Sequence, residues 1–330
     1  MPLSEAKAGR LRALSNSEGV IAAIAMDQRG SLRKAIAAAK GVHPQSICQE
    51  SMREFKSAVA KVLTPHASAI LLDPDFGLEA AALRHPRCGL LLAYEASGYD
   101  NTRPGRRPDL LPGVSVHRLC EWGAGAVKIV LYYSPFDDPQ VNEEKHAFIE
   151  RIGAECHALE LPFFLEFVGY DPAGGDEKGP EYARRKPEIV TRSIAEFTQD
   201  RYRADVLKVE APVNLDYVEG TPGFKGIAVH SRREALDHFR EAGAATRKPF
   251  IYLSAGVSTA QFMESLGLAV EAGSGFSGVL CGRSTWKDGI PVYARHGASA
   301  FEEWLALEGV RNIASINEVL RSATPWFSRG

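Results

Sequence analysis

The chain has 330 residues, of which 45% are hydrophobic and 24% are charged, and its net charge is −2 at pH 7. This balance excludes the basic excess of a nucleic-acid-binding protein and the acidic excess of a solvating tail. The sequence shows neither the apolar run of a signal peptide nor the roughly 18 apolar residues of a membrane span. The five cysteines form no CxxC pair, which favours reduced thiols over a disulfide framework. We therefore expect a cytoplasmic protein without membrane or nucleic-acid partners.

Short apolar runs alternate with longer helical patterns along the chain. Most of the runs are continuously apolar, as is typical of parallel strands that are buried on both faces. The predicted strands cover residues 20–26, 69–73, 89–94, 127–132, 163–168, 205–210, 250–254 and 278–282. A short amphipathic segment precedes them, and the predicted helices cover residues 31–39, 45–63, 78–84, 114–122, 140–159, 182–198, 232–242, 259–272, 292–307 and 313–322.

Eight strands that alternate with helices close naturally into a (β/α)8, or TIM, barrel. The sequence thus predicts an α/β fold with a single barrel domain over residues 1–330, an N-terminal helix and an extra C-terminal helix. The structural alternative is a doubly wound open sheet, which places a glycine-rich nucleotide loop after its first strand. Here the polar residues 27–30 follow that strand. Residues 273–278 match G-x-G-x-x-G, but they follow a helix and precede a strand, which indicates an ordinary turn.

Three consecutive predicted strands each carry a charged side chain inside an apolar run. These residues are Lys128, Glu166 and Lys208. Burying an isolated charge is costly, so such residues are either paired or functional. A buried ion pair that only bridges the strands is the structural alternative. Asp27 and Arg283, at the ends of the first and last strands, favour a functional site at the carboxyl end of the barrel.

This set of residues suits chemistry on a carbonyl carbon. A lysine amine attacks a carbonyl only when unprotonated, so its usual pKa of about 10.4 must fall through burial or a nearby positive charge. We expect Lys128 to supply that charge to Lys208, which would form an iminium with a ketone. Glu166 suits the proton shuttle, because burial raises the pKa of a carboxyl group. Asp27, at a wetter strand end, is expected to stay ionised and to orient a substrate hydroxyl or Lys208.

The ends of the last two strands offer groups that bind phosphate. TIM barrels frequently hold phosphate there on backbone N–H groups. The predicted phosphate-binding residues are Ser254, Ala255, Gly256, Gly282 and Arg283.

Two polar segments are expected near the barrel mouth. Arg103, Arg106 and Arg107 follow the third strand and, with Arg29, form a candidate site for a second anionic group, although a solvated loop is an equally good interpretation. The glycine-rich residues 171–179 follow the fifth strand and are interpreted as an active-site loop. The nine histidines form no HExxH or His-x-His pair, so we predict no metal site and no cofactor.

The same residues match a known family along nearly the whole chain. The sequence resembles bacterial tagatose 1,6-bisphosphate aldolases, which are class I, metal-independent enzymes. The matching stretches are residues 25–30, 68–77, 89–100, 127–133, 162–166, 205–214, 251–258 and 278–286.

The resemblance implies a role for each candidate residue. It makes Lys208 the Schiff-base lysine and Glu166 the main acid/base, with Asp27 and Lys128 assisting at the reacting carbons. It further places Gln28 and Arg29 in the substrate site, and Ser254, Gly282 and Arg283 at the phosphate on the dihydroxyacetone side.

The implied reaction is reversible cleavage of D-tagatose 1,6-bisphosphate to dihydroxyacetone phosphate and D-glyceraldehyde 3-phosphate. Fructose 1,6-bisphosphate is a further expected substrate, and barrels of this kind commonly pair into homodimers. The loops at residues 103–107, 134–139 and 173–178 depart from the family pattern. An aldolase or transaldolase for 6-deoxy-6-sulfofructose or its 1-phosphate is therefore the alternative within the same chemistry. A metal-dependent aldolase and a non-covalent sugar-phosphate isomerase or binding barrel are the alternatives outside it.

Overall fold

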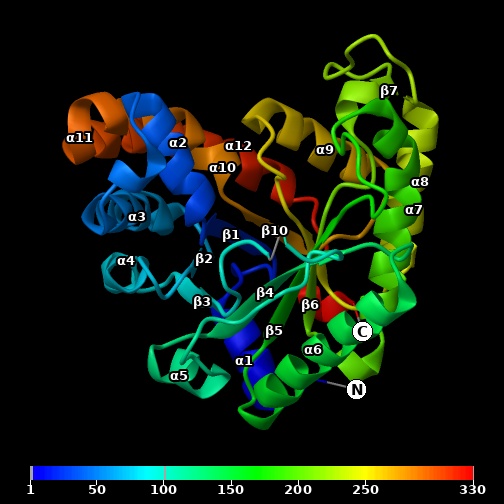
Figure 1. Cartoon of the computed structure of the whole chain (residues 1–330), viewed down its shortest axis with the longest axis horizontal. Helices are drawn as coiled ribbons and strands as arrows, with labels where there is room; N and C mark the ends of the chain where they lie inside the picture. The colour runs from blue at the N-terminus through cyan, green and yellow to red at the C-terminus, as the bar shows by residue number, and fades with distance from the viewer. Residues whose placement is uncertain (1–2, 100–101, 330) are drawn as a thin grey trace.

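Eight parallel strands form a closed barrel in the computed structural model, which describes residues 3–99 and 102–329 (Figure 1). Residue 100, the last of the family-like stretch 89–100, lies outside the described residues. The strand order around the barrel is β1-β10-β9-β6-β5-β4-β3-β2. The strands are β1 (Ile21–Met26), β2 (Ala69–Leu72), β3 (Gly89–Ala93), β4 (Ala126–Tyr133), β5 (Phe163–Gly169), β6 (Val206–Val209), β9 (Phe250–Tyr252) and β10 (Gly278–Cys281). The predicted TIM barrel is confirmed, and the open-sheet alternative is wrong.

Helices surround the barrel and connect its strands (Figure 1). Two of them begin with a capping box, in which a serine and the side chain three residues later satisfy each other's backbone N–H groups. Among the described residues none of the helices is long and apolar enough to cross a membrane. The helices are α1 (Glu5–Ala13), α2 (Gly30–Lys40), α3 (Gln49–Leu63), α4 (Leu78–Leu83), α5 (Val116–Glu121), α6 (Pro139–Ala158), α7 (Pro180–Phe197), α8 (Arg232–Ala244), α9 (Thr259–Glu271), α10 (Arg283–Trp286), α11 (Ile290–Trp304) and α12 (Val310–Leu320).

Four details differ from the sequence prediction. The helix predicted at residues 45–63 begins with a separate 3-10 turn, Pro44–Ser46, before α3. A short helix, α10, starts directly after β10. The predicted break between the last two helices is instead a π-helical stretch, Leu305–Gly309, that joins α11 to α12. Two short strands, β7 (Val218–Glu219) and β8 (His230–Ser231), pair outside the barrel, where two-residue strands give no sequence signal.

The barrel has an apolar interior separate from the packing between strands and helices. The interior cluster includes small residues on some strands and bulky ones on others, as in Ala23, Ala93, Phe164 and Ile251. Side chains along a strand point alternately in and out, so the intervening residues pack against the helices instead. The interior is therefore filled by side chains, as expected for eight strands.

Helix α1 closes the amino end of the barrel (Figure 1). Its Leu11 is fully buried in the interior cluster. Lys7 of the same helix forms a buried ion pair with Asp205, which precedes β6, at 2.6 Å. Trp326, near the other end of the chain, joins this cluster and donates a hydrogen bond to Ser15. The amino end of the barrel is thus covered, so a site can form only at the carboxyl end.

Candidate active site

Side-chain alternation points the charged residues into the barrel. Phe164 of β5 and Val206 of β6 belong to the apolar interior, and the next residues with the same orientation are Glu166 and Lys208. On β4, Lys128 has the same inward orientation. Because orientation repeats every two residues along a strand, the charged side chains form the layer directly above the apolar interior.

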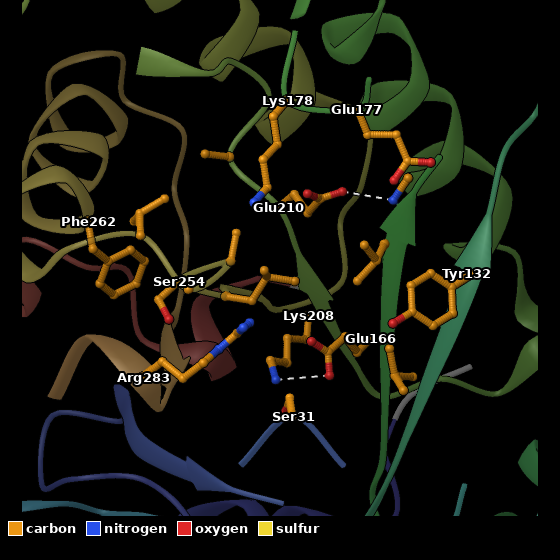
Figure 2. Close-up of a pocket in the computed structure, with 18 of the residues that line it drawn as sticks. Ser31, Tyr132, Glu166, Glu177, Lys178, Lys208, Glu210, Ser254, Phe262 and Arg283 are labelled. Atoms are coloured by element: carbon orange, nitrogen blue, oxygen red, sulfur yellow. Dashed lines mark hydrogen bonds and ion pairs between the residues drawn. The ribbon is translucent and has the colours of Figure 1, made fainter. Parts of the chain in front are cut away.

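The carboxylate of Glu166 is shared by the two lysines. Its Oε2 atom lies 2.9 Å from Nζ of Lys208 and 2.9 Å from Nζ of Lys128. Figure 2 shows the Lys208–Glu166 contact at the centre of the cavity, with the two side chains on neighbouring strands. All three residues are buried. The two amino groups therefore meet at a single oxygen atom, which places a cation beside the candidate nucleophile.

Lys128 is surrounded by carboxylates from three other strand ends. Its Nζ lies 2.7 Å from Glu95 and 2.9 Å from each of Asp27 and Glu166. Burial lowers the pKa of Lys128, but Asp27, Glu166 and Glu95 outweigh burial and hold it well above its usual value. Lys128 therefore stays an ammonium group whose three N–H bonds can all be used within the cluster.

The carboxyl groups of the cluster divide into two kinds. Burial raises the pKa of Glu166, but Lys128 and Lys208 outweigh it, so the pKa of Glu166 is lowered. The expectation of a raised pKa for Glu166 is therefore wrong, because its oxygen accepts from two cations and their effect exceeds that of burial. The pKa of Asp27 is also lowered, since the two lysines outweigh its burial. Burial does raise the pKa of Glu95, and the nearby charge of Asp27 adds to the effect.

Glu95 was missed by the sequence analysis. It follows β3, two residues after the inward-facing Ala93, so the same alternation that identifies Lys128 would have identified it. Its side chain is 5% exposed, and its Oε2 atom is buried without a hydrogen-bond partner among the described residues. An antiparallel bridge to Leu110 and a hydrogen bond from Arg29 to its carbonyl oxygen fix its backbone.

Gln28 and Arg29 form the turn after β1. The Arg29 guanidinium donates to Asp75 at 3.0 Å and to the carbonyl of Glu95 at 2.7 Å, so two of its nitrogens are already engaged. Lys56 of α3 holds this turn from below through the carbonyls of Met26 and Gln28. Lys56 also escaped prediction, because a helical lysine gives no alternation signal.

The predicted phosphate-binding residues follow β9 and β10 and lie together on one side of the cavity. Ser254 is buried, and Ala255 and Gly256 both have left-handed backbones, with φ values of 47° and 78°. This turn brings the Gly256 backbone against the Arg283 guanidinium, since a Cβ atom on Gly256 would lie 2.7 Å from Cζ. Figure 2 shows Ser254 and Arg283 on the same side of the cavity, facing Lys208. Gly282 allows close packing, because a Cβ there would lie 2.1 Å from the carbonyl of Ala25.

One cavity of about 740 Å³ joins these groups at the carboxyl end of the barrel. Of the predicted site residues, only Gly282 does not line it. The predicted loop 171–179 reaches the cavity through Glu177 and Lys178, and Lys186 and Glu210 form an ion pair at 3.4 Å on the same wall. The predicted residues that line the cavity are Asp27, Gln28, Arg29, Lys128, Glu166, Lys208, Ser254, Ala255, Gly256 and Arg283.

The arginine-rich loop does not line this cavity. Arg106 forms an ion pair with Glu177 and lies over the ring of Tyr170, 4.6 Å from its centroid. Arg107 pairs with Glu144, and Arg103 and Arg107 line a separate cavity of about 950 Å³. The interpretation that the three arginines join Arg29 around one anion is therefore wrong, because none of them lines the cavity that Arg29 lines.

Histidines are absent from the lining of the active-site cavity among the described residues. His146 packs among the rings of Tyr133, Phe197 and Tyr202. Within residues 3–99 and 102–329, no group of three or more His, Cys, Asp or Glu side chains is placed to hold a metal ion.

A family model described as DeoC/LacD family aldolase matches residues 21–288, which include every predicted site residue. The chain belongs to this family. It is 49% identical to tagatose 1,6-diphosphate aldolase 2 of Enterococcus faecalis over 330 residues, covering 100% of this chain and 98% of the relative. It is 47% identical to a tagatose 1,6-diphosphate aldolase of Listeria monocytogenes, covering 99% and 95% of the two chains. The predicted resemblance to tagatose 1,6-bisphosphate aldolases is confirmed.

Solved structures share the fold of this DeoC/LacD family member at low sequence identity. Fructose-bisphosphate aldolase of Plasmodium falciparum gives a TM-score of 0.71 at 13% identity, covering 98% of each chain. A fructose-bisphosphate aldolase of Slackia heliotrinireducens gives 0.61 at 16% identity, covering 95% of this chain and 90% of that one. At these identities the likeness supports the barrel and no residue role.

Proposed function

We propose that the protein is a class I aldolase that reversibly cleaves D-tagatose 1,6-bisphosphate to dihydroxyacetone phosphate and D-glyceraldehyde 3-phosphate. Such an aldolase is a carbon–carbon lyase. The observation that carries the proposal is a buried lysine, Lys208, at the carboxyl end of a barrel strand, with its Nζ against Glu166 and the ammonium group of Lys128 on the same oxygen. The substrate follows from the names of the relatives at 46–49% identity.

The first stage of the mechanism builds the Schiff base. The unprotonated Nζ of Lys208 attacks the C2 carbonyl of the ketose, and one proton then moves from that nitrogen to the carbonyl oxygen to give a neutral carbinolamine. Glu166 then delivers to the C2 hydroxyl the proton that Lys208 gave up on becoming an amine, and the hydroxyl leaves as water while the iminium forms. Its Oε2 is hydrogen-bonded to Lys208 Nζ at 2.9 Å, so it lies within reach of groups bonded to that nitrogen.

The second stage breaks the C3–C4 bond. A carboxylate removes the proton of the C4 hydroxyl, the C3–C4 electron pair moves into the iminium, and glyceraldehyde 3-phosphate leaves. Asp27 suits this base, because its lowered pKa keeps it ionised beside Lys128. The enamine is then protonated at C3, and water releases dihydroxyacetone phosphate from Lys208.

Two walls of the cavity suit the two ends of the substrate. Ser254, Gly256 and Arg283 would bind the phosphate on the dihydroxyacetone side, through a hydroxyl, a backbone N–H and a guanidinium. Lys178 and the Lys186–Glu210 pair lie on the opposite wall, where Figure 2 places Lys178 and Glu210 away from Arg283. A mixed-charge wall of this kind suits a sugar hydroxyl together with a terminal anion.

The nearest alternative function is an aldolase or transaldolase for 6-deoxy-6-sulfofructose or its 1-phosphate. The two functions differ in the terminal anion of the substrate, which is a phosphate in one and a sulfonate in the other. Comparing kcat/KM for tagatose 1,6-bisphosphate, fructose 1,6-bisphosphate and sulfofructose 1-phosphate tests the assignment. We expect the two bisphosphates to exceed the sulfonate. A higher value for the sulfonate would reassign the substrate while keeping the Schiff-base chemistry.

Borohydride trapping tests the covalent step. Wild-type protein treated with dihydroxyacetone phosphate and borohydride should carry one adduct, and peptide mapping should find it on Lys208. Lys208→Met is the matched control and should carry none. An isomerase or binding barrel would give no adduct in the wild type, and loss of activity in a chelator with recovery in zinc would favour a metal-dependent aldolase.

Further features are proposed from the family and from the sequence. We propose a single domain over residues 1–330 that acts in the cytoplasm on a small ketose phosphate, without a cofactor, as a homodimer or higher homo-oligomer. Sedimentation of the purified protein tests the assembly, and activity after exhaustive dialysis against a chelator tests independence from a metal.

A further inference from the structure

Five charged residues at the base of the cavity do not contain equal numbers of acidic and basic groups. Asp27, Glu95 and Glu166 supply three carboxyl groups, while Lys128 and Lys208 supply two amino groups. Their side chains are between 2% and 11% exposed, so water compensates little of the charge. If Lys208 is the nucleophile, it must also give up a proton. An acceptor inside the cluster lets Lys208 give up that proton without any change in the total charge of the buried groups.

An unbroken line of hydrogen bonds leads from Lys208 to Glu95. Lys208 Nζ donates to Glu166 Oε2 at 2.9 Å, and Lys128 Nζ lies 2.9 Å from the same oxygen. Lys128 Nζ in turn donates to Glu95 Oε1 at 2.7 Å. Glu95 ends this line, since its other oxygen is buried and accepts no hydrogen bond among the described residues. A carboxylate with such an oxygen is poorly stabilised, and protonation removes the charge responsible.

The three carboxyl groups differ in how well they hold a proton. Burial raises the pKa of Glu95, whereas the lysines lower those of Asp27 and Glu166 below their usual range. The difference follows from the neighbouring charges, because Lys128 and Lys208 both act on Asp27 and Glu166, whereas Glu95 contacts Lys128 and is also close to the negative charge of Asp27.

We propose that Glu95 takes up the proton that Lys208 loses when it becomes nucleophilic. In this transfer an N–H bond of Lys208 breaks and an O–H bond forms on Glu166. Lys128 passes one proton to Glu95 and accepts one from Glu166, so Lys128 remains an ammonium group. The net change is an amine on Lys208 and a carboxylic acid on Glu95, with the total charge unaltered. Glu95 is a positioning residue in this scheme, because it acts through Lys128 and Glu166.

The same path in reverse serves the next step of the proposed function, on which this inference rests. The carbinolamine hydroxyl leaves as water only after it gains a proton. The proton held on Glu95 returns through Lys128 to Glu166, and Glu166 delivers it to the departing oxygen. Attack and dehydration therefore use one proton that stays inside the cluster.

Other charged groups near the two ends of this line set the background for a pH experiment. Lys208 is reached by the carboxyl groups of Glu166 and Asp27 and lies near the thiol of Cys281 on β10. Three charged groups face Glu95. They are Lys128 on β4, Asp27 directly after β1, and Arg29 in the turn that follows β1.

Glu95→Gln is the decisive variant, because it keeps the shape of the side chain but cannot take up the proton. The measurement is the rate of borohydride-trapped adduct formation on Lys208 with dihydroxyacetone phosphate, from pH 5.5 to about pH 9.5. We expect the rate at pH 7 to fall by about 100-fold. It should recover as the pH rises, because hydroxide can then take the proton that the variant side chain no longer accepts. The acidic limb of the profile should move to higher pH, and Glu95→Asp should keep the wild-type shape.

Glu144→Gln is the matched control, since Glu144 lies outside the cavity and contacts Arg107. A Glu95→Gln profile that coincides with the wild type overturns the inference, and so does a uniform loss at every pH, which indicates a structural role. If wild-type protein forms no adduct, the proposed function fails instead, so the two failures are distinguishable.

An infrared measurement on wild-type protein needs no variant. The transfer leaves the total charge unaltered and needs no substrate, so substrate-free protein labelled with [13C]glutamate should already hold an amine on Lys208 and show one protonated carboxyl band at pH 7.5, from Glu95. The absence of that band overturns the inference even if Glu95→Gln does not fold.

Discussion

The two ends of the barrel are built by the same strands for different purposes. At the amino end, Leu11 of α1 is fully buried in the interior and the ion pair between Lys7 and Asp205 is closed off from the cavity. At the carboxyl end, Lys128 and Lys208 occupy inward positions with the same orientation. A shift of two residues along a strand thus separates an apolar layer from a layer of five charged groups.

The comparison shows how stability and chemistry share one barrel. An apolar layer gains free energy from burial, whereas burying charges costs free energy that only good pairing offsets. The free energy gained by the apolar layer therefore offsets the cost of burying the charged layer. Changes at the closed end should alter stability alone, and changes at the charged layer should alter activity far more than stability.

Lys208→Met should have the largest effect of these changes. We expect kcat for ketose bisphosphate cleavage to fall by at least about 10⁴-fold, because no other amine can form the iminium. Glu166 keeps its contact with Lys128 in this variant, so the thermal midpoint should change little. Steady-state kinetics and a melting curve on the same sample give both values. Activity within tenfold of the wild type would refute the assignment of the nucleophile.

Leu11→Ala tests the closed end. The substitution should lower the free energy of unfolding by about 2–5 kcal/mol, because it leaves a cavity in the interior layer. KM should stay unchanged, since Leu11 lies at the opposite end of the strands. Urea denaturation measures the loss, and Leu307→Ala, at a side chain 70% exposed, is the control with a change within about 0.5 kcal/mol. A raised KM for Leu11→Ala would show that the two ends are coupled.

Lys145→Met removes a buried charge at the carboxyl end that lies outside the active-site cavity. Burial lowers the pKa of Lys145 from 10.5 to about 8, so protonation penalises the folded state. Between pH 8 and 10.5 the unfolded chain binds more protons, and wild-type stability rises with pH. The variant should be more stable at pH 7 by about 2–3 kcal/mol, after its lost hydrogen bond to Tyr170 is counted.

Unfolding curves for Lys145→Met and the wild type, recorded at pH 7 and pH 10, test this sign. The advantage should shrink at the higher pH. An advantage that is independent of pH would mean that shape rather than charge decides the outcome.

Ala255→Gly should have the smallest effect. Ala255 has a left-handed backbone with φ of 47°, which costs an alanine about 1 kcal/mol relative to glycine. Glycine relieves that strain but loosens the turn that carries Ser254. We expect a thermal midpoint that is unchanged or slightly higher and a KM for the bisphosphate that rises a few-fold. An unchanged KM would separate this turn from phosphate binding.

The sequence predicts the barrel well because buried parallel strands are continuous apolar runs. It predicts the core of the site for the same reason, since Lys128, Glu166 and Lys208 interrupt such runs. Glu95 was not predicted, because it lies just beyond the end of its apolar run, where a glutamate gives no signal by itself. Its inward orientation becomes clear only when residues are counted in steps of two from Ala93.

The sequence fails where a position is set by contacts between distant segments. Arg106 is held by Glu177, 71 residues further along the chain, and no local pattern encodes that pairing. The predicted direction of the Glu166 pKa shift was wrong for a related reason. Burial is visible in a strand pattern, but the second cation on the same oxygen is visible only in the folded barrel.

The meeting of Ser15 and Trp326 beneath the barrel has a practical consequence. Segments near both ends of the described chain lie on the side away from the active-site cavity (Figure 1). A linker attached through either segment would hold the molecule on a solid support with its cavity facing the solution. Immobilised protein should then turn over substrate at the same rate whichever of the two segments carries the tether.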